Sequence, residues 1–165
     1  MNILISEFAY EGRGYVNASP IQLLTAGVPE ALVLDAVKPI LKAAVDARAE
    51  AVRLSLITGG VGQSMEYAEA DAQAREALAA APGAATAERY AMLAASIGID
   101  IDPQTGKPAT DVLGVARSVL TARDGWLAAG AAIRKARLTA KAAIDGASTF
   151  AEAASAVASV SWPSL

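Results

Sequence analysis

The segment ITGGVGQSMEY contains three glycines within four positions, Gly59, Gly60 and Gly62. A phosphate-binding loop needs glycines placed so that successive backbone amides point at one anion, and its best-known form follows a strand and ends in Gly-Lys-Ser/Thr. Here the preceding segment has helical periodicity, no lysine follows Gly62, and Glu66 adds a negative charge. We therefore expect these glycines to form a turn or hinge between two helices rather than a nucleotide site.

A second candidate site is the stretch from Asp100 to Asp111, which also contains Asp102 and Thr105. Its oxygen-bearing side chains partly match a calcium-binding loop, and Asp111 falls at the twelfth position, where such a loop has its bidentate glutamate. The match fails because an uncharged residue occupies the fifth position and the loop glycine, Gly106, comes one residue late. A solvated turn is the favoured interpretation, and neither a metal nor another cofactor is predicted.

Basic side chains gather late in the chain, at Arg134, Lys135, Arg137 and Lys141. No aromatic residue that could stack on a base lies between them, and the net charge is −3, so no nucleic-acid partner is expected. Residues 66–102 carry seven acidic and two basic side chains, whereas residues 117–141 carry six basic and one acidic. These opposite charges favour docking of the two segments, within one chain or between subunits.

The chain has no cysteine and no histidine. This removes thiol nucleophiles, imidazole bases, disulfides and the commonest zinc ligands together. The carboxylates lie in polar patterns, and no two are placed in an apolar setting that would raise a pKa. We predict no catalytic residues and no enzyme; a small enzyme acting through carboxylates or a loop-bound metal is the open alternative.

The elements that would position such residues are mainly helical. Residues 1–18 are expected to form a β-hairpin around the turn Glu11-Gly12-Arg13-Gly14, whose glycines tolerate positive φ. Residues 19–98 are expected to be helical, with helices that begin near Pro29, Ser64 and Thr86 and a glycine-rich turn at 59–62. Residues 99–109 are expected to form a loop, and residues 110–165 a long helix plus a C-terminal helix. The predicted class is mainly α: a short N-terminal hairpin followed by an alanine-rich helical bundle or coiled-coil-like helices.

The long C-terminal helix carries two apolar stripes with heptad spacing. Val112, Val119, Trp126, Ile133 and Ala140 fall seven residues apart, and a leucine stripe runs beside them. We expect the interface between chains to be anchored by five residues of these stripes: Val119, Leu120, Trp126, Leu127 and Ile133.

The composition indicates a core that a partner completes. The chain has 41 alanines and only 5% aromatic residues, and each buried alanine removes little apolar area from water. A homo-oligomer, with a trimer favoured, is therefore expected, and the hairpin edge is a candidate for pairing with another chain. No stretch of about 20 apolar residues predicts a membrane span, and the short apolar run after Met1 predicts no signal peptide, so the chain is expected to be soluble and unexported.

The segment Arg53-Leu54-Ser55-Leu56-Ile57-Thr58-Gly59-Gly60-Val61-Gly62-Gln63, followed by Met65 and Tyr67, resembles a recurrent segment of small bacteriophage tail proteins. The opening region with Gly27-Val28-Pro29-Glu30 is similar to the start of tail-fibre-associated and tail-assembly proteins, and the C-terminal part is similar to the alanine-rich end of the same group. That similarity rests on Trp126, Ile133, Arg137, Lys141 and Trp162-Pro163. The stretch from Asp100 to Asp111 departs from the pattern and looks like a local insertion.

The resemblance implies a non-enzymatic structural subunit of a phage tail tip or tail fibre, with other tail or fibre proteins as partners. The protein would be made in the host bacterial cytoplasm and located in the virion. A tail-fibre assembly chaperone that is absent from the mature particle is the alternative.

Overall fold

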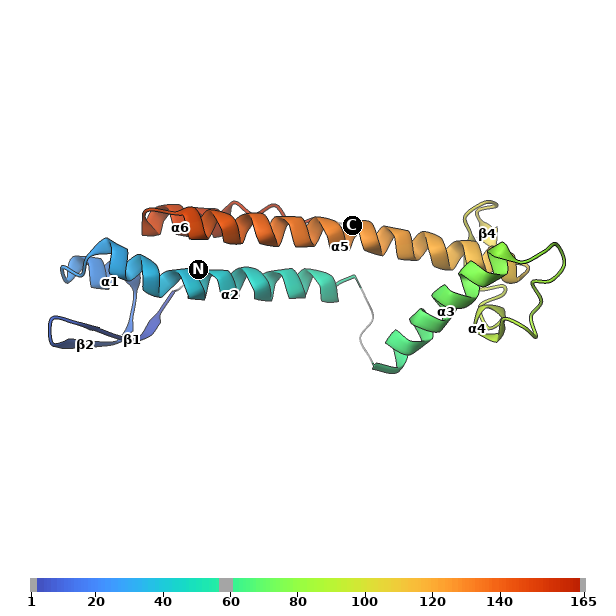
Figure 1. Ribbon diagram of the computed structural model, residues 1–165, viewed down its shortest axis with the longest axis horizontal. Coiled ribbons are helices and arrows are strands. Elements are labelled where there is room, and N and C mark those ends of the chain that lie inside the picture. Colours follow the sequence, from blue (N-terminus) through green and yellow to red (C-terminus); the bar gives the residue numbers. More distant parts are fainter. Residues whose placement is uncertain (1–2, 57–60, 164–165) are drawn as a thin grey trace. The chain divides into compact units, whose positions relative to one another are not determined.

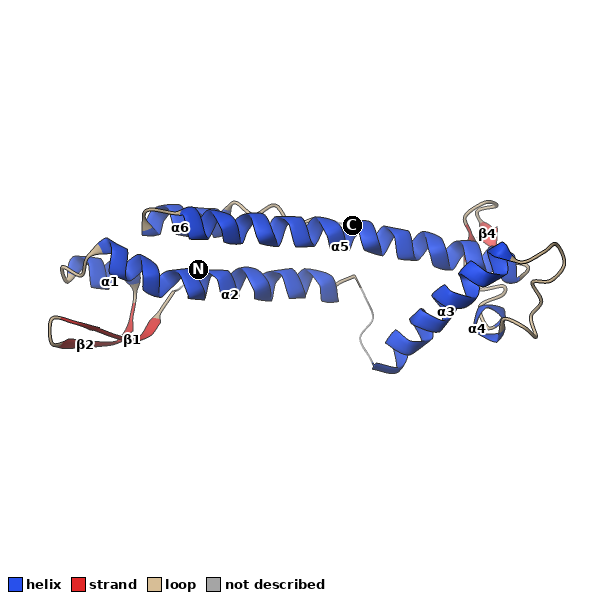
Figure 2. Cartoon of the chain, viewed as in Figure 1, coloured by secondary structure: helices blue, strands red, loops and turns tan. Residues whose placement is uncertain are grey.

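The computed structural model describes residues 3–56 and 61–163, and it shows a mainly α-helical chain with a short N-terminal β-hairpin, which confirms the predicted class (Figure 1, Figure 2). Gly59 and Gly60 lie outside the described residues, and Gly62 falls in the first turn of a helix. The elements in chain order are β1 (Ile5–Tyr10), β2 (Arg13–Ala18), α1 (Pro20–Thr25), α2 (Glu30–Leu54), α3 (Val61–Ala79), α4 (Ala91–Ala94), β3 (Ile101–Asp102), β4 (Lys107–Pro108), α5 (Val112–Gly146) and α6 (Phe150–Ala158).

The chain forms two compact units that interleave along the sequence. Unit 1 comprises Met1–Arg53 together with Ala131–Leu165, and unit 2 comprises Leu54–Gly130. The predicted regions 1–18, 19–98, 99–109 and 110–165 follow chain order and do not coincide with these units. The reason is that α5, with 35 residues, is long enough to take part in both.

The hairpin of unit 1 turns at Glu11 and Gly12, which have φ angles of 45° and 75°. Two successive positive φ angles are typical of the tight turn whose twist matches that of the flanking strands. The turn is thus shorter than predicted, because Gly14 lies inside β2, opposite Ala9. At the other end of the hairpin, Ile5 pairs with Ala18, and both are buried in the core of unit 1.

Helices α1, α2 and α6 surround that core together with the C-terminal part of α5. On α2, four valines and leucines spaced four residues apart are buried: Val33, Val37, Leu41 and Val45. Alanines of the two later helices, Ala140 and Ala153, fill the core beside Ile144. Such small side chains allow helix axes to approach closely, at the lower end of the usual interaxial range of about 8–10 Å.

Capping boxes define where α1 and α6 begin. The Ser19 side chain accepts a hydrogen bond from the Gln22 backbone amide, and the Ser19 backbone amide donates to the Gln22 side-chain oxygen. Thr149 and Glu152 make the same reciprocal pair. Each cap satisfies backbone donors that a helix start leaves open. The first amide of α6, on Phe150, also donates to Glu30 at the start of α2.

Unit 2 contains α3, α4, the β3–β4 hairpin and the first part of α5. Its core joins Tyr90 and Leu93 to alanines and valines of α3 and α5, including Ala74 and Val115. Several predicted boundaries were wrong. Helix α3 begins at Val61 rather than Ser64, and the helix expected to begin near Thr86 is reduced to the four residues of α4. Residues 99–109, expected to be a loop, include the β3–β4 pair.

Candidate interaction surfaces

The five predicted interface anchors lie on α5 and differ in exposure. Ile133 is fully buried within its own chain and therefore has no surface to offer another chain. Val119 and Leu120 are half-buried against the core of unit 2. Trp126 and Leu127 remain exposed, at 44% and 43% of their surface. The heptad stripe is thus covered near its ends and uncovered at Trp126.

Unit 1 also exposes large apolar side chains. Leu138, on the part of α5 that belongs to unit 1, is 47% exposed. The heptad stripes did not predict Leu138, because it lies outside the five anchors expected from them. On the hairpin, Val16 is 74% exposed and lines a shallow hollow of about 360 Å³ together with Phe8 and Tyr15.

Part of the predicted basic cluster joins α5 to α2. Asp46 accepts hydrogen bonds from Arg137 and, at 2.7 Å, from the Lys141 ammonium. These bonds, that of Lys141 first, lower the pKa of the Asp46 carboxyl below its ordinary value.

The same edge of the helix pair continues to the end of α5. Lys42 pairs with Asp145 at 2.7 Å, and the Lys38 ammonium donates to the Asp145 backbone carbonyl at 2.9 Å. Lysines 38 and 42 and Asp46 recur every four residues on α2 and meet residues that recur every four on α5, so the contacts set the antiparallel register of the two helices (Figure 1). Among the described residues, Arg134 and Lys135 have no ion-pair partner.

Asp102, in the stretch that only partly matches a calcium loop, holds the β3–β4 hairpin against α5. Asp102, 4% exposed, receives Nε of Arg117 at 2.9 Å on one carboxylate oxygen and Nη2 at 2.6 Å on the other. The backbone amide of Gln104 donates to the same carboxylate at 3.0 Å. The Arg117 bonds are the main cause that lowers the pKa of Asp102 to about 2, and the Gln104 amide adds to them.

The start of α5 completes this arrangement. Asp111 accepts a hydrogen bond from the Gly114 amide at 2.8 Å, as an N-cap residue does. Gly114 itself lies so close to the hairpin that an added Cβ would be 2.9 Å from the Ala109 Cβ. Residues 103–106 form an exposed turn, in line with the solvated turn that was predicted, while Asp102 and Ala109 are buried and attach the hairpin to α5. Within the described ranges no group of three acidic side chains could hold a metal ion.

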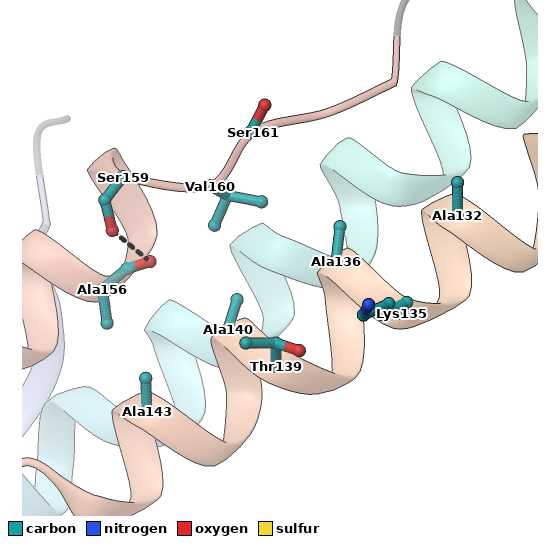
Figure 3. A pocket seen from close by; sticks show the side chains of 10 residues that line it. All are labelled: Ala132, Lys135, Ala136, Thr139, Ala140, Ala143, Ala156, Ser159, Val160 and Ser161. Atoms are coloured by element: carbon teal, nitrogen blue, oxygen red, sulfur yellow. Dashed lines mark hydrogen bonds between the residues drawn. The ribbon is translucent and has the colours of Figure 1, made fainter.

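A second hollow, of about 380 Å³, lies between α5 and the C-terminal segment of unit 1 (Figure 3). Figure 3 shows methyl groups of α5 alanines, Ala136 and Ala140 among them, facing Ala156 and Val160. Lys135 is the charged residue of this lining. The hollow is thus a shallow apolar groove made chiefly of small side chains.

One buried polar atom in unit 2 lacks a partner. Tyr90 is 1% exposed, and its hydroxyl forms no hydrogen bond within the described part of the chain. The Arg89 guanidinium lies 5.4 Å from the centre of the ring, a favourable cation–π distance. The ring therefore acts as a core residue of unit 2.

In the described ranges, every helix is too short or too polar to cross a bilayer, in agreement with the prediction from the sequence. Comparison of the chain with protein-family models, with curated proteins and with solved structures found no match.

Proposed function

We propose that this chain is a non-enzymatic structural subunit of a bacteriophage tail, at the tail tip or in a tail fibre, and that it acts by oligomerising and by contacting other tail proteins. The observation that carries the proposal is the pair of neighbouring apolar side chains that α5 exposes in unit 2, where Trp126 and Leu127 are 44% and 43% exposed. Large apolar side chains gathered on one long helix are typical of surfaces that bind other proteins.

Three of the acidic residues support a structural role because their side chains hold parts of the fold together. Asp102 binds Arg117, Asp111 caps α5, and Asp46 binds Arg137 and Lys141. The resemblance of residues 53–67 to small tail proteins gives this role its setting: synthesis in the host bacterial cytoplasm and a final location in the virion.

The hairpin favours a second candidate, a tail-fibre assembly chaperone that is absent from the mature particle. Within the described residues, β1 and β2 form a two-stranded sheet, so each strand has one edge that pairs with no other described strand. Val16 is strongly exposed there. An extended segment of a fibre protein could add to such an edge during assembly and leave it afterwards.

Quantitative peptide mass spectrometry on purified particles tests both candidates. Cells would express this gene with its neighbouring genes, and a structural subunit should be present at a constant copy number that is a multiple of three or six. If the protein is abundant in the lysate but absent from the particles, the result favours the assembly chaperone over the structural subunit. If no particles form, the assignment to a phage tail fails.

Two matched variants show whether the α5 surface takes part. Leu127→Asp places a charge on that surface, and Ala47→Asp places the same charge at an exposed position of α2. Both chains should keep their helical circular dichroism, and only Leu127→Asp should lose incorporation. Equal incorporation of the two would show that Leu127 is not part of the contact.

A further inference from the structure

We propose that β1 pairs with β1 of a second copy, antiparallel, so that the two hairpins form one continuous sheet around a twofold axis at Phe8. This inference rests on the oligomerisation that is part of the proposed function, and it names the strand and the register through which two copies associate. The whole contact belongs to unit 1, because both strands of the hairpin lie in that unit.

The hairpin turn determines which backbone groups of β1 point away from β2. Tyr10 and Arg13 flank a two-residue turn, so they exchange backbone hydrogen bonds with each other. Hydrogen-bonded and non-hydrogen-bonded pairs alternate along an antiparallel ladder. Phe8 therefore also bonds to β2, whereas Glu7 and Ala9 direct their amides and carbonyls away from it.

These outward groups form a short open edge. Glu7 and Ala9 are exposed, and within the described part of the chain β1 pairs with β2 alone. Ile5 also directs its backbone groups outward, but the whole residue is buried in the core of unit 1. The shallow hollow beside the edge is lined by residues of β1 and β2 alone. The open edge thus consists of Glu7 and Ala9, placed symmetrically on either side of Phe8.

A twofold axis at Phe8 uses both open residues at once. Glu7 of each copy then faces Ala9 of the other, and the residues of each such pair exchange backbone hydrogen bonds. Phe8 faces Phe8 of the second copy in a non-hydrogen-bonded pair, in which side chains lie closest. Since the ring centres of Phe8 and Tyr15 are 6.5 Å apart within one chain, a continuous row of aromatic side chains crosses the combined sheet.

Charge excludes the neighbouring registers. Facing residues of a twofold pair lie on the same face of the sheet, and side chains alternate between faces, so the register can shift only in steps of two residues. A shift in one direction places Glu7 against Glu7 of the second copy, and a shift in the other places Glu7 against Glu11 of the second copy. Like charges directly opposite each other are destabilising. The register centred on Phe8 avoids both repulsions, because Glu7 there faces the small, uncharged Ala9.

Strand β2 offers a poorer edge for such pairing. Its Asn17 has a φ of 49°, outside the extended conformation, and its Gly14 has no side chain to contact a neighbour across the strands. Within Ile5–Tyr10, β1 has neither a glycine nor a positive φ angle. Twofold pairs through β1 can be combined with a threefold axis, which gives copy numbers that are multiples of six.

Cysteine cross-linking of the full-length chain tests the strand and the register, because the chain has no cysteine of its own. Phe8→Cys places two thiols opposite each other across the axis, at a separation that a disulfide can span, so copper-phenanthroline oxidation should give mostly disulfide-linked dimer. Tyr15→Cys is the matched control, because Tyr15 is the half-buried partner of Phe8 on β2, and this variant should stay monomeric. A Phe8→Cys chain that does not cross-link, or a Tyr15→Cys chain that cross-links equally well, would overturn the inference.

A charge series at Ala9 tests the same register and leaves the aromatic side chains in place. Ala9→Lys puts a cation opposite Glu7 of the second copy on both sides of the axis, so it should strengthen dimerisation about threefold or more in sedimentation equilibrium. Ala9→Glu should weaken dimerisation by a similar factor. Glu7→Lys combined with Ala9→Glu exchanges the two charges and should dimerise as strongly as Ala9→Lys. Val16→Lys, on the same exposed face of β2, is the matched control and should leave dimerisation unchanged.

Three sedimentation results would also overturn the inference: an unchanged chain that stays monomeric at about 100 μM, a combined variant that does not recover, or a Val16→Lys chain that dimerises as strongly as Ala9→Lys. A monomeric chain that still enters particles at constant copy number would reject the β1 pairing and leave the proposed function standing. A chain that dimerises through β1 but is absent from particles would support the pairing and reject the structural subunit.

Discussion

Replacing Gly114 by alanine should destabilise unit 2, although the same change elsewhere on α5 should stabilise the protein. In a helix interior, alanine is favoured over glycine by about 0.5–1 kcal/mol, because glycine has more conformational freedom in the unfolded chain and loses more of it on folding. At Gly114, however, the new Cβ would lie 2.9 Å from the Ala109 Cβ, and 3.3 Å from both the Ala109 Cα and Oδ2 of Asp102.

Ala109 cannot withdraw easily. Its amide donates to the Asp100 carbonyl at 2.8 Å, its carbonyl accepts from the Gly98 amide at 2.8 Å, and the residue is 2% exposed. Overpacking of this kind costs about 1–3 kcal/mol, which exceeds the gain in helix propensity. We therefore expect a net loss of about 1–2 kcal/mol, or a decrease of several degrees in the melting temperature.

Gly125→Ala is the matched control, because a Cβ there meets no atom within 4 Å. That variant should gain up to about 1 kcal/mol. Both variants would be followed by urea unfolding, monitored by far-ultraviolet circular dichroism. In an Ala109→Gly background, Gly114→Ala should cost less, because the nearest contact is gone. If Gly114→Ala stabilised the protein as much as Gly125→Ala, the close approach of the hairpin to α5 would be refuted.

Three further predictions concern single side chains. The pKa of Asp102 is lowered to about 2 from 3.8, so its bonds to Arg117 stabilise the fold above about pH 4, and this stabilisation is lost as the pH falls toward 2. Asp102→Asn should therefore have a lower melting temperature at pH 7. Its melting temperature should also depend less on pH between pH 4 and 2 than that of the unchanged chain. Tyr90→Phe should leave the melting temperature unchanged or raise it, because the hydroxyl that it removes is buried without a partner; a marked decrease would reveal one. Trp126→Ala should lower the free energy of unfolding of the monomer by less than the roughly 3 kcal/mol expected for a fully buried tryptophan, because 44% of the Trp126 surface is exposed. Urea unfolding at protein concentrations at which the chain is monomeric would measure this loss.

Local patterns predicted the elements because local physics forms them. The apolar stripe after Pro29 and the heptads after Thr110 required helices, which α2 and α5 confirm. The short-range signals of the hairpin likewise predicted β1 and β2. Errors of a few residues arose where a helix start depends on its surroundings, as at Ser64 and Thr86.

Local sequence patterns could not predict the contacts between residues that lie far apart in the chain. Asp102 is a loop acid in the sequence, and its bond to Arg117 exists because the β3–β4 hairpin folds back over the first turns of α5. The basic residues of α5 were predicted to dock on the acidic segment 66–102. Arg117 and Arg123 do bind there, to Asp102 and Asp71, whereas Arg137 and Lys141 bind Asp46 of α2.

Sequence alone determined the helical class, the hairpin and the two stripes of α5, because periodicity and turn chemistry act between neighbours along the chain. Tertiary structure decided which members of those stripes remain exposed. Ile133 and Trp126 stand seven residues apart in one repeat, yet one is fully buried and the other is 44% exposed. The physical reason is that burial depends on what packs against a residue, and a repeating pattern does not say where along a helix its covering partner ends.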